Sequence, residues 1–181
     1  MSDPFGLKSS IRSVEDYPIA GVTFRDITSL LETPSAFVSA CQELRRLSDA
    51  FGPTALVSIE SRGFIFAGPV AYSLSLPMVL ARKPDKLPND TYQKAFDLEY
   101  GSTSLEIQKN TALSEVDRVV IIDDLIATGG TAIACAQLLQ ENFSVARENI
   151  LILAVIDLPA LGGSDAIVSS GYNVETLTEY S

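Results

Sequence analysis

The sequence predicts one α/β domain built on an open, mostly parallel twisted sheet that is flanked by helices. Three apolar runs rich in Val, Ile and Leu have the length of buried strands: TALVSI (54–59), VVII (119–122) and NILILAVIDL (149–158). Segments with helical spacing of apolar residues separate these runs. Because strands joined by helical crossovers pair in parallel, this order favours a parallel sheet.

The first long helix is expected to begin at Thr33-Pro34, where an N-cap residue precedes a proline at the first helical position. It should end near Phe51-Gly52-Pro53. The helical spacing is carried by Phe37, Val38, Cys41, Leu44 and Leu47.

The strand TALVSI follows, then a helix over GFIFAGPVAYSLSL (63–76) and a second strand over MVLAR (78–82). Residues 83–91 (KPDKLPNDT) hold two prolines and four charged residues, which predicts an exposed, mobile loop. We expect that loop to lead into a hairpin inserted between two parallel strands. Its arms would be 92–100 and 103–109, its turn Gly101-Ser102, and Leu105 and Ile107 would share one face.

The remaining elements continue the alternation of strands and helices. VVII is predicted to be a central strand, Thr131 to Leu139 a helix, NILILAVIDL another strand and VETLTEY (174–180) a short last strand.

Composition narrows the class of protein. The chain has 181 residues, enough for one domain, and 46% of them are hydrophobic. Its 13 basic and 23 acidic residues give a net charge of −10, which disfavours a nucleic-acid partner. We expect no membrane span and no signal peptide, and therefore a cytoplasmic protein.

The absence of histidine restricts the possible chemistry. Without it the Ser-His and Cys-His nucleophile designs and nearly all zinc sites are excluded, so an acid or base must be a carboxylate, Lys, Tyr or Cys. Cys41 and Cys135 are far apart in apolar helical patterns, which favours two buried, reduced thiols.

The segment VVIIDDLIATGGT (119–131) places two acids, Asp123 and Asp124, at the end of a buried strand. Ligands of open α/β sheets bind beyond the carboxyl ends of the strands. The segment that follows consists of Ala127, Thr128, Gly129, Gly130 and Thr131 and leads into a helix, so its backbone N–H groups can converge on an anion. Carboxylates accept hydrogen bonds from vicinal hydroxyls and can hold Mg²⁺ through water. The predicted ligand is a ribose with a terminal phosphate.

A plainer interpretation stays open for this segment. A Gly-rich βα turn alone can serve only helix entry, with the acids facing solvent. The order of four apolar residues, two acids, two further residues and ATGGT is a tighter pattern, however, and it lacks the GxxxxGK[ST] spacing of nucleoside-triphosphate loops.

This strand and loop resemble the signature of the type I phosphoribosyltransferases, which bind phosphoribosyl pyrophosphate (PRPP) there. Four other stretches are similar to the adenine-specific branch of that family: GVTFRDIT (21–28), ESRGFIFAGP (60–69), RKPDKLP (82–88) and DLEYGSTSLEIQK (97–109). The resemblance extends from about Gly21 to Leu139. It implies an N-terminal hood over residues 1–32 and Mg²⁺-dependent transfer of phosphoribose from PRPP to adenine, giving AMP and pyrophosphate.

By this resemblance, Glu60, Ser61, Arg62 and Gly63 form a pyrophosphate loop with a cis peptide between Glu60 and Ser61. Catalysis must neutralise the leaving pyrophosphate, which asks for basic residues in an acidic chain. Arg62, with Arg82, Lys83 and Lys86, offers such a cluster, although each could instead be an ordinary surface charge.

Asp85 departs from the family pattern. The family usually has glycine at this position, so the sequence places an added acid beside the expected phosphate contacts.

The resemblance also assigns the chemistry at the base. Glu99 matches the family's acid/base residue near N7 of the purine, unless the hairpin turns it outward as a solvated strand residue. Phe24 would stack on one face of adenine and Leu125 on the other, while backbone groups of Thr23 and Arg25 read the amine edge. Phe24 as an ordinary core residue is the alternative.

Ala127 separates the chain from hypoxanthine-guanine relatives, which usually carry an acid at this position, and it fits an adenine enzyme. Another purine base and a non-catalytic PRPP-sensing regulator remain as alternatives. The family resemblance implies a homodimer. The Mg²⁺ would be held through PRPP and water near Asp123 and Asp124, with no direct protein ligand assigned.

Overall fold

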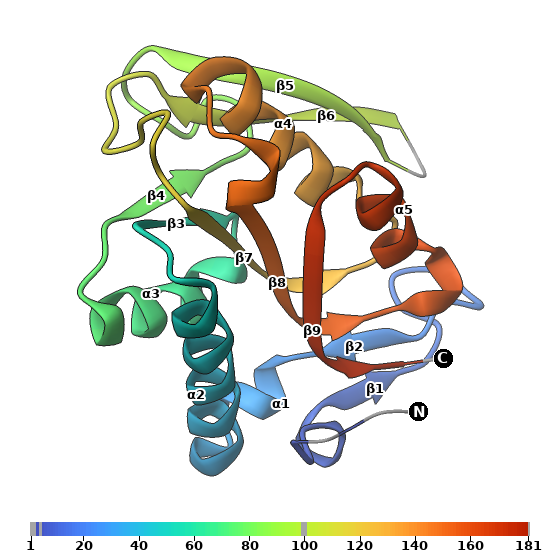
Figure 1. Ribbon diagram of the computed structural model, residues 1–181. Coiled ribbons are helices and arrows are strands. Elements are labelled where there is room, and N and C mark those ends of the chain that lie inside the picture. The colour runs from blue at the N-terminus through green and yellow to red at the C-terminus, as the bar shows by residue number, and fades with distance from the viewer. Residues whose placement is uncertain (1–2, 4, 99–100, 181) are drawn as a thin grey trace.

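Five parallel strands form the central sheet in the order β4-β3-β7-β8-β9 (Figure 1). They are β3 (Ala55–Ile59), β4 (Met78–Ala81), β7 (Val119–Ile126), β8 (Ile150–Asp157) and β9 (Asn173–Glu179). The computed structural model describes residue 3, residues 5–98 and residues 101–180. All five strands agree with predicted segments, and the mostly parallel sheet is confirmed.

Helices cover both faces of this sheet because its strands are apolar on both sides (Figure 1). On one face α2 (Pro34–Phe51) and α3 (Gly63–Leu74) pack on residues such as Leu56 and Val120. On the other face α4 (Gly130–Phe143) and α5 (Gly163–Ser169) pack on residues such as Val57 and Ile121. Adjacent positions along a strand therefore enter different cores.

The helix signals in the sequence are confirmed. α2 has Pro34 at its first position, and Gly52 ends it in the left-handed conformation, with φ 71°. α3 ends at Leu74, two residues before the predicted end, because Ser75 has a left-handed conformation. α4 runs four residues beyond the predicted Leu139, to Phe143.

β7 extends beyond the predicted 119–122. Its pairing with β3 stops at Ile122, whereas its pairing with the longer β8 continues to Ile126. The prediction that Asp123 and Asp124 follow the strand is therefore wrong on the β8 side and right on the β3 side. A neighbouring strand set this end, and the local sequence could not show it.

The predicted hairpin consists of β5 (Thr91–Leu98) and β6 (Gly101–Gln108), and it lies between β4 and β7 in sequence. Leu98 pairs with Gly101, so Gly101 and Ser102 belong to β6 and the predicted turn at these residues is wrong.

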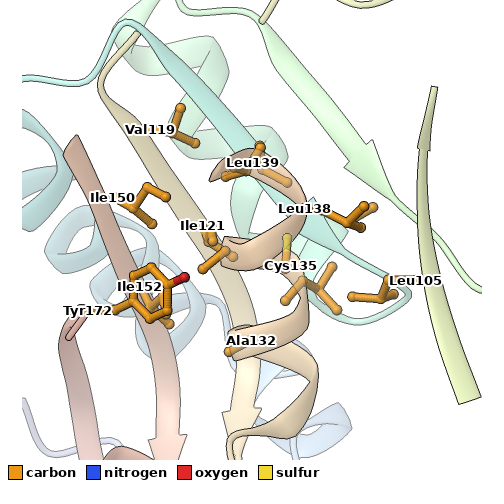
Figure 2. Packing of buried hydrophobic residues seen from close by; sticks show 14 of the residues in the cluster. Leu105, Val119, Ile121, Ala132, Cys135, Leu138, Leu139, Ile150, Ile152 and Tyr172 are labelled. Atoms are coloured by element: carbon orange, nitrogen blue, oxygen red, sulfur yellow. The ribbon is translucent and has the colours of Figure 1, made fainter. Parts of the chain in front are cut away.

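The hairpin packs on α4. Leu105 of β6 lies beside Cys135 and Leu138 of α4 (Figure 2). The rings of Tyr92 and Phe143 meet edge to face at 5.4 Å, and Lys94 Nζ lies 2.5 Å from Glu141 Oε1. Leu105 and Ile107 are both buried on one face, as predicted.

The N-terminal segment adds a small antiparallel pair, β1 (Arg12–Val14) and β2 (Phe24–Asp26), and a single helical turn, α1 (Thr28–Leu31). Short 3₁₀ turns occupy Lys8–Ser10, Arg147–Asn149 and Pro159–Leu161. Leu7, Ile11, Ile27 and Leu30 are buried in the α2 and α3 side of the core, which attaches this segment to the domain.

Tyr180, directly after β9, ties the N-terminal segment to the sheet edge. The guanidinium carbon of Arg25 lies 4.2 Å from the centre of the Tyr180 ring, and Lys8 Nζ lies 5.2 Å from it. The backbone N–H of Tyr180 donates to the carbonyl of Asp157 at 2.9 Å. Both ends of the chain therefore meet at one corner (Figure 1).

The prediction of two buried thiols holds only in part. Cys135 is buried in α4, but Cys41 of α2 is partly exposed, and both are free. Among the helices of the described residues, none is both long enough and apolar enough to cross a membrane.

Asp157, the last residue of β8, is a buried carboxyl whose Oδ1 has no hydrogen-bond partner among the described residues. Burial raises the pKa of Asp157, and the negative charges of Glu179 and Asp165 add to this. Together they outweigh the opposing effect of the nearby Ser164 hydroxyl and Leu158 backbone N–H. Its ionised form thus costs free energy in the folded state.

We predict that Asp157→Asn raises the Tm at pH 8. A folded-state pKa above the unfolded value removes stability as pH rises through it, and asparagine cannot ionise. The gain over wild type should shrink at pH 4, where a little less than half of the unfolded carboxyl is already protonated. Thermal melts at both pH values test this, with the exposed Asp90→Asn as the control of equal charge change. A lower Tm for Asp157→Asn at pH 8 would contradict the prediction.

Candidate functional site

A cleft of about 460 Å³ opens at the carboxyl ends of β3 and β7. The hairpin forms its opposite wall. Its lining residues are Ile59, Glu60, Ser61, Arg62, Lys83, Phe96, Thr103, Ser104, Leu105, Asp123, Asp124, Leu125 and Thr131. Eight of the residues predicted from the sequence as site residues are thus gathered around one cavity.

A smaller hollow of about 120 Å³ lies beside the cleft and is formed by the predicted phosphate cradle, residues 127–131. Asp123, Leu125 and Thr131 line both spaces. Gly129 has φ 79°, a conformation that favours glycine, and it is followed by the first residue of α4. The first backbone N–H groups of α4 have no intrahelical acceptor, so the cradle suits an anion.

The two adjacent acids have different surroundings. Asp124 is buried, and its Oδ2 lies 2.7 Å from Nε of Arg62. Asp123 is partly exposed to the cleft, and its Oδ1 accepts the backbone N–H of Asp124 at 2.8 Å. Desolvation within the site raises the pKa of Asp123 well above its ordinary range, and the negative charge of Asp124 adds to it. A group that donates hydrogen bonds or carries positive charge is therefore favoured beside Asp123.

The loop from Glu60 to Gly63 connects β3 to α3, and the Glu60–Ser61 peptide is cis, as the resemblance implied. Gly63 begins α3 directly against β7. A Cβ there would lie 2.7 Å from the carbonyl oxygen of Ile122 and 3.2 Å from Cα of Asp123. Glycine thus lets the loop approach the two acids closely.

Arg62 connects three parts of the site. Besides the ion pair with Asp124, its guanidinium carbon lies 5.6 Å from the centre of the Phe24 ring. The side chain is 43% exposed, whereas that of Asp124 is 7% exposed. Arg62 was expected to contact pyrophosphate; here it neutralises an acid of the neighbouring strand.

Glu60 organises the other basic residues. Its carboxylate accepts Nε of Arg82 at 3.0 Å, Nη2 of Arg82 at 3.3 Å and the backbone N–H of Lys83 at 3.0 Å. Burial alone would raise the pKa of Glu60, but these hydrogen bonds and positive charges hold it below its ordinary value. Arg82 also donates Nη1 to the carbonyl of Lys86 at 3.0 Å. Of the predicted basic cluster, Arg62 and Lys83 line the cleft, and Arg82 connects Glu60 with the backbone of Lys86.

Two of the predicted base-binding residues, Leu125 and Phe24, are connected with the cleft. Phe24 and Arg25 are in β2, and Thr23 precedes it. Phe24 meets the ring of Tyr17 edge to face at 5.2 Å, and its link to the cleft is the contact with Arg62. Leu125 lines the cleft directly. Phe24 is half-buried and outside both core clusters, which weakens its alternative interpretation as a core residue.

Glu99, the predicted acid/base residue, lies outside the described residues. The hairpin arms that flank it contribute Phe96, Thr103, Ser104 and Leu105 to the cleft wall. Sequence reasoning did not select Phe96, Thr103 or Ser104 as site residues. The alternation of the hairpin was visible, but which of its faces meets β7 depends on tertiary packing.

Comparison with known proteins agrees with this geometry. The family model described as "Phosphoribosyl transferase domain" matches residues 28–161. The adenine phosphoribosyltransferase of Pelagibacter ubique is 44% identical over 96% of this chain and 97% of its own length. That of Actinobacillus pleuropneumoniae is 45% identical over 96% and 95%. The chain belongs to the adenine phosphoribosyltransferase family.

Solved structures of the family have the same fold. The adenine phosphoribosyltransferase from Thermoanaerobacter pseudethanolicus has a TM-score of 0.88 and 36% identity, and the match covers 97% of this chain and 98% of that one. The enzyme from Giardia lamblia, complexed with 9-deazaadenine, has a TM-score of 0.90, 34% identity and coverage of 97% and 96%.

The family departure at Asp85 has a backbone explanation. Asp85 has φ 62°, in the left-handed region where glycine is most at ease and where aspartate is one of the better tolerated side chains. Replacing the glycine usual at this position therefore keeps the turn between Lys83 and Lys86 while adding a carboxylate.

We predict that Glu60→Gln lowers the Tm at pH 7.5 by a few degrees. A neutral amide loses charge-assisted hydrogen bonds to Arg82 and Lys83, and about 1 kcal/mol corresponds to roughly 2–4 °C for a domain of this size. Since the folded pKa of Glu60 is lowered, its contribution is present above the unfolded pKa and is lost as pH falls through the folded value. The deficit should thus narrow toward pH 3.5.

Glu43→Gln serves as the control, because Glu43 pairs with an Arg46 side chain that is 60% exposed. Exposed pairs contribute little, so its Tm should stay near that of wild type. Equal Tm values for Glu60→Gln and wild type at pH 7.5 would show that Glu60 does not stabilise this corner.

Proposed function

We propose that this chain is an adenine phosphoribosyltransferase, a pentosyltransferase that moves the 5-phosphoribosyl group of PRPP to adenine and releases AMP and pyrophosphate. This reaction salvages free purine base. One observation supports this proposal. The paired carboxylates Asp123 and Asp124 lie next to the glycine-rich cradle at the carboxyl ends of the strands, in a chain of this family.

The phosphoribosyl part of PRPP fits the β7–α4 junction. Its 5-phosphate would accept backbone N–H groups of Ala127 to Thr131 together with the hydroxyls of Thr128 and Thr131, and the helix dipole of α4 favours its charge. Its ribose hydroxyls would donate to Asp123 and Asp124. The raised pKa of Asp123 makes such donors favourable partners.

The pyrophosphate fits the opposite side of the cleft. Ser61, Arg62 and Gly63, with Glu60 as the organising carboxylate, would bind it together with Arg82, Lys83 and Lys86. Arg62 is engaged with Asp124, and Arg82 with Glu60. Arg62 is the more exposed of the two arginines. We propose that it leaves Asp124 and binds the departing pyrophosphate, where it neutralises the developing negative charge.

Mg²⁺ is the cofactor that these residues fit. Two adjacent carboxylates are hard oxygen ligands, and Mg²⁺ usually keeps several waters and shares ligands with substrate phosphates. Asp123 and Asp124 would hold it through water and through PRPP. When bound, the ion neutralises charge on the pyrophosphate as it leaves.

Adenine would bind between Phe24 and Leu125, with the backbone of Thr23 and Arg25 at its amine edge. Two relatives support a base site in this fold: the Giardia lamblia enzyme binds 9-deazaadenine, and the Saccharomyces cerevisiae enzyme, 31% identical, is complexed with adenine. Ala127 leaves no acid at the position where hypoxanthine-guanine relatives usually carry one.

The proposed reaction breaks the bond between C1 of the ribose and the pyrophosphate oxygen and forms one to the purine nitrogen. The transition state resembles an oxocarbenium ion, which negative groups beneath the ribose stabilise. Glu99 is the proposed acid/base residue at N7 of the purine. Proton transfer of this kind contributes about 10²–10⁴-fold in rate.

The test is a comparison of bases. Purified protein with PRPP and Mg²⁺ is offered adenine, hypoxanthine, guanine, xanthine and uracil separately, and nucleotide is measured by chromatography. We expect AMP from adenine alone. Product from another base would show that the pocket does not select adenine. PRPP binding without any product would favour a non-catalytic regulator.

Glu99→Gln is the matched variant for this assay. We expect it to fold normally, to bind PRPP with near wild-type affinity and to lose about 10²–10⁴-fold in kcat. Glu106→Gln, on the same hairpin, controls for the loss of one charge there. Wild-type turnover in Glu99→Gln would remove Glu99 from the mechanism.

The expected protein partner is a second copy of this chain. The solvent-facing side of α3 also carries large apolar side chains, since Ile65 is 38% exposed and Tyr72 is 89% exposed. Such a face supports the proposal that another subunit covers it. Sedimentation should give a mass near twice 19.4 kDa, and a monomer at micromolar concentration would contradict this. Neither nucleic acid nor membrane is expected as a partner, and the cytoplasm is the expected compartment.

A further inference from the structure

Gly163, at the start of α5, packs backbone to backbone against the phosphate cradle. An ideal Cβ on Gly163 would collide with the carbonyl oxygen of Ala127, and it would lie 2.8 Å from the backbone nitrogen of Gly129. In the opposite direction, a Cβ on Gly129 would lie 2.6 Å from the carbonyl oxygen of Gly163. The backbone at each of these two positions therefore leaves no room for a side chain at the other.

Several contacts fix the position of Gly163. The backbone N–H of Leu158 donates to the carbonyl of Ile126 at 3.0 Å, which joins the end of β8 to the residue before the cradle. Gly162, with φ 70°, turns the chain into α5. Ile167 then buries α5 in the same core as α4. The segment behind the cradle is therefore held by the sheet and by the core.

This contact matters because the cradle acts through its backbone. The orientation of N–H groups in a loop follows the peptide planes, and an anion site loses affinity when donors move by a fraction of an ångström. Ala127 and Gly129 bracket Thr128, so a push on both would rotate the peptides at the middle of the cradle.

We propose that Gly163 is a positioning residue that holds the cradle backbone in the conformation that binds the 5-phosphate of PRPP. The inference rests on the proposed function and extends it to a residue remote in sequence from the ATGGT segment. Gly163 touches no substrate; it acts through Ala127 and Gly129.

The test is Gly163→Ala. The added methyl must displace a backbone carbonyl, so we expect the KM for PRPP and the Kd for ribose 5-phosphate to rise by roughly 10–100-fold. The KM for adenine should change less than twofold, because the hood lies elsewhere. A purely structural role would lower the amount of folded enzyme without shifting either constant.

Gly162→Ala is the matched control. Gly162, unlike Gly163, has a positive φ, and its Cβ would meet no described atom within 4 Å. It should therefore lose stability through backbone strain and keep wild-type affinity for PRPP. Unchanged phosphate affinity in Gly163→Ala, or an equal loss in Gly162→Ala, would overturn the proposal.

Hydrogen exchange of the wild-type protein gives a test if Gly163→Ala does not fold. Ribose 5-phosphate should slow exchange of the amides at 162–166 together with those at 127–131. Protection confined to 127–131 would overturn the coupling.

Both readouts use binding, so they separate this inference from the proposed reaction. A wild-type protein that binds ribose 5-phosphate but makes no AMP would refute the reaction alone. A wild-type protein that binds neither ribose 5-phosphate nor PRPP would refute both.

Discussion

The site depends on the unequal pairing of β7. One edge of this strand stops pairing with β3 at Ile122, while the other edge stays paired with β8 as far as Ile126. The four residues from Asp123 to Ile126 therefore lie beside β8 as part of its pairing, but they are not paired with β3. The released edge is where Gly63 brings the start of α3 against Ile122 and Asp123. A rigid strand therefore presents two carboxylates to an open cleft, which a loop could not do with equal precision.

Charge balance is the second condition, since acids collected at one sheet edge repel each other. Arg62 meets Asp124, and Arg82 meets Glu60, so each of these two acids has a cation from a neighbouring element. Asp123 lacks such a direct partner among the described residues, and desolvation together with the charge of Asp124 raises its pKa. The proposed substrate, with its hydroxyls and a divalent ion, would supply hydrogen-bond donors and positive charge at Asp123.

Local patterns sufficed for much of this molecule. Apolar runs gave the five strands of the sheet, Pro34 and Gly52 gave the limits of α2, and the DD and ATGGT pair gave the cradle. Failures arose where a distant segment decides. The length of β7 follows from β8, Gly101 pairs with Leu98 as part of β6, and Phe96 reaches the cleft because α4 supports the hairpin. Gly163 carried no local signal, because its value lies in a contact with residues more than thirty positions earlier.

The stacking of Tyr180 on Arg25 and Lys8 bears on how a base could reach its pocket. The N-terminal segment is joined to the domain through α1 and α2 at one end, and the Tyr180 ring fastens its middle to the sheet edge. Lifting it would break two cation–π contacts, each about 0.5–1 kcal/mol, in addition to uncovering Leu7 and Ile27. We therefore expect the N-terminal segment to stay in place while a base enters the cleft.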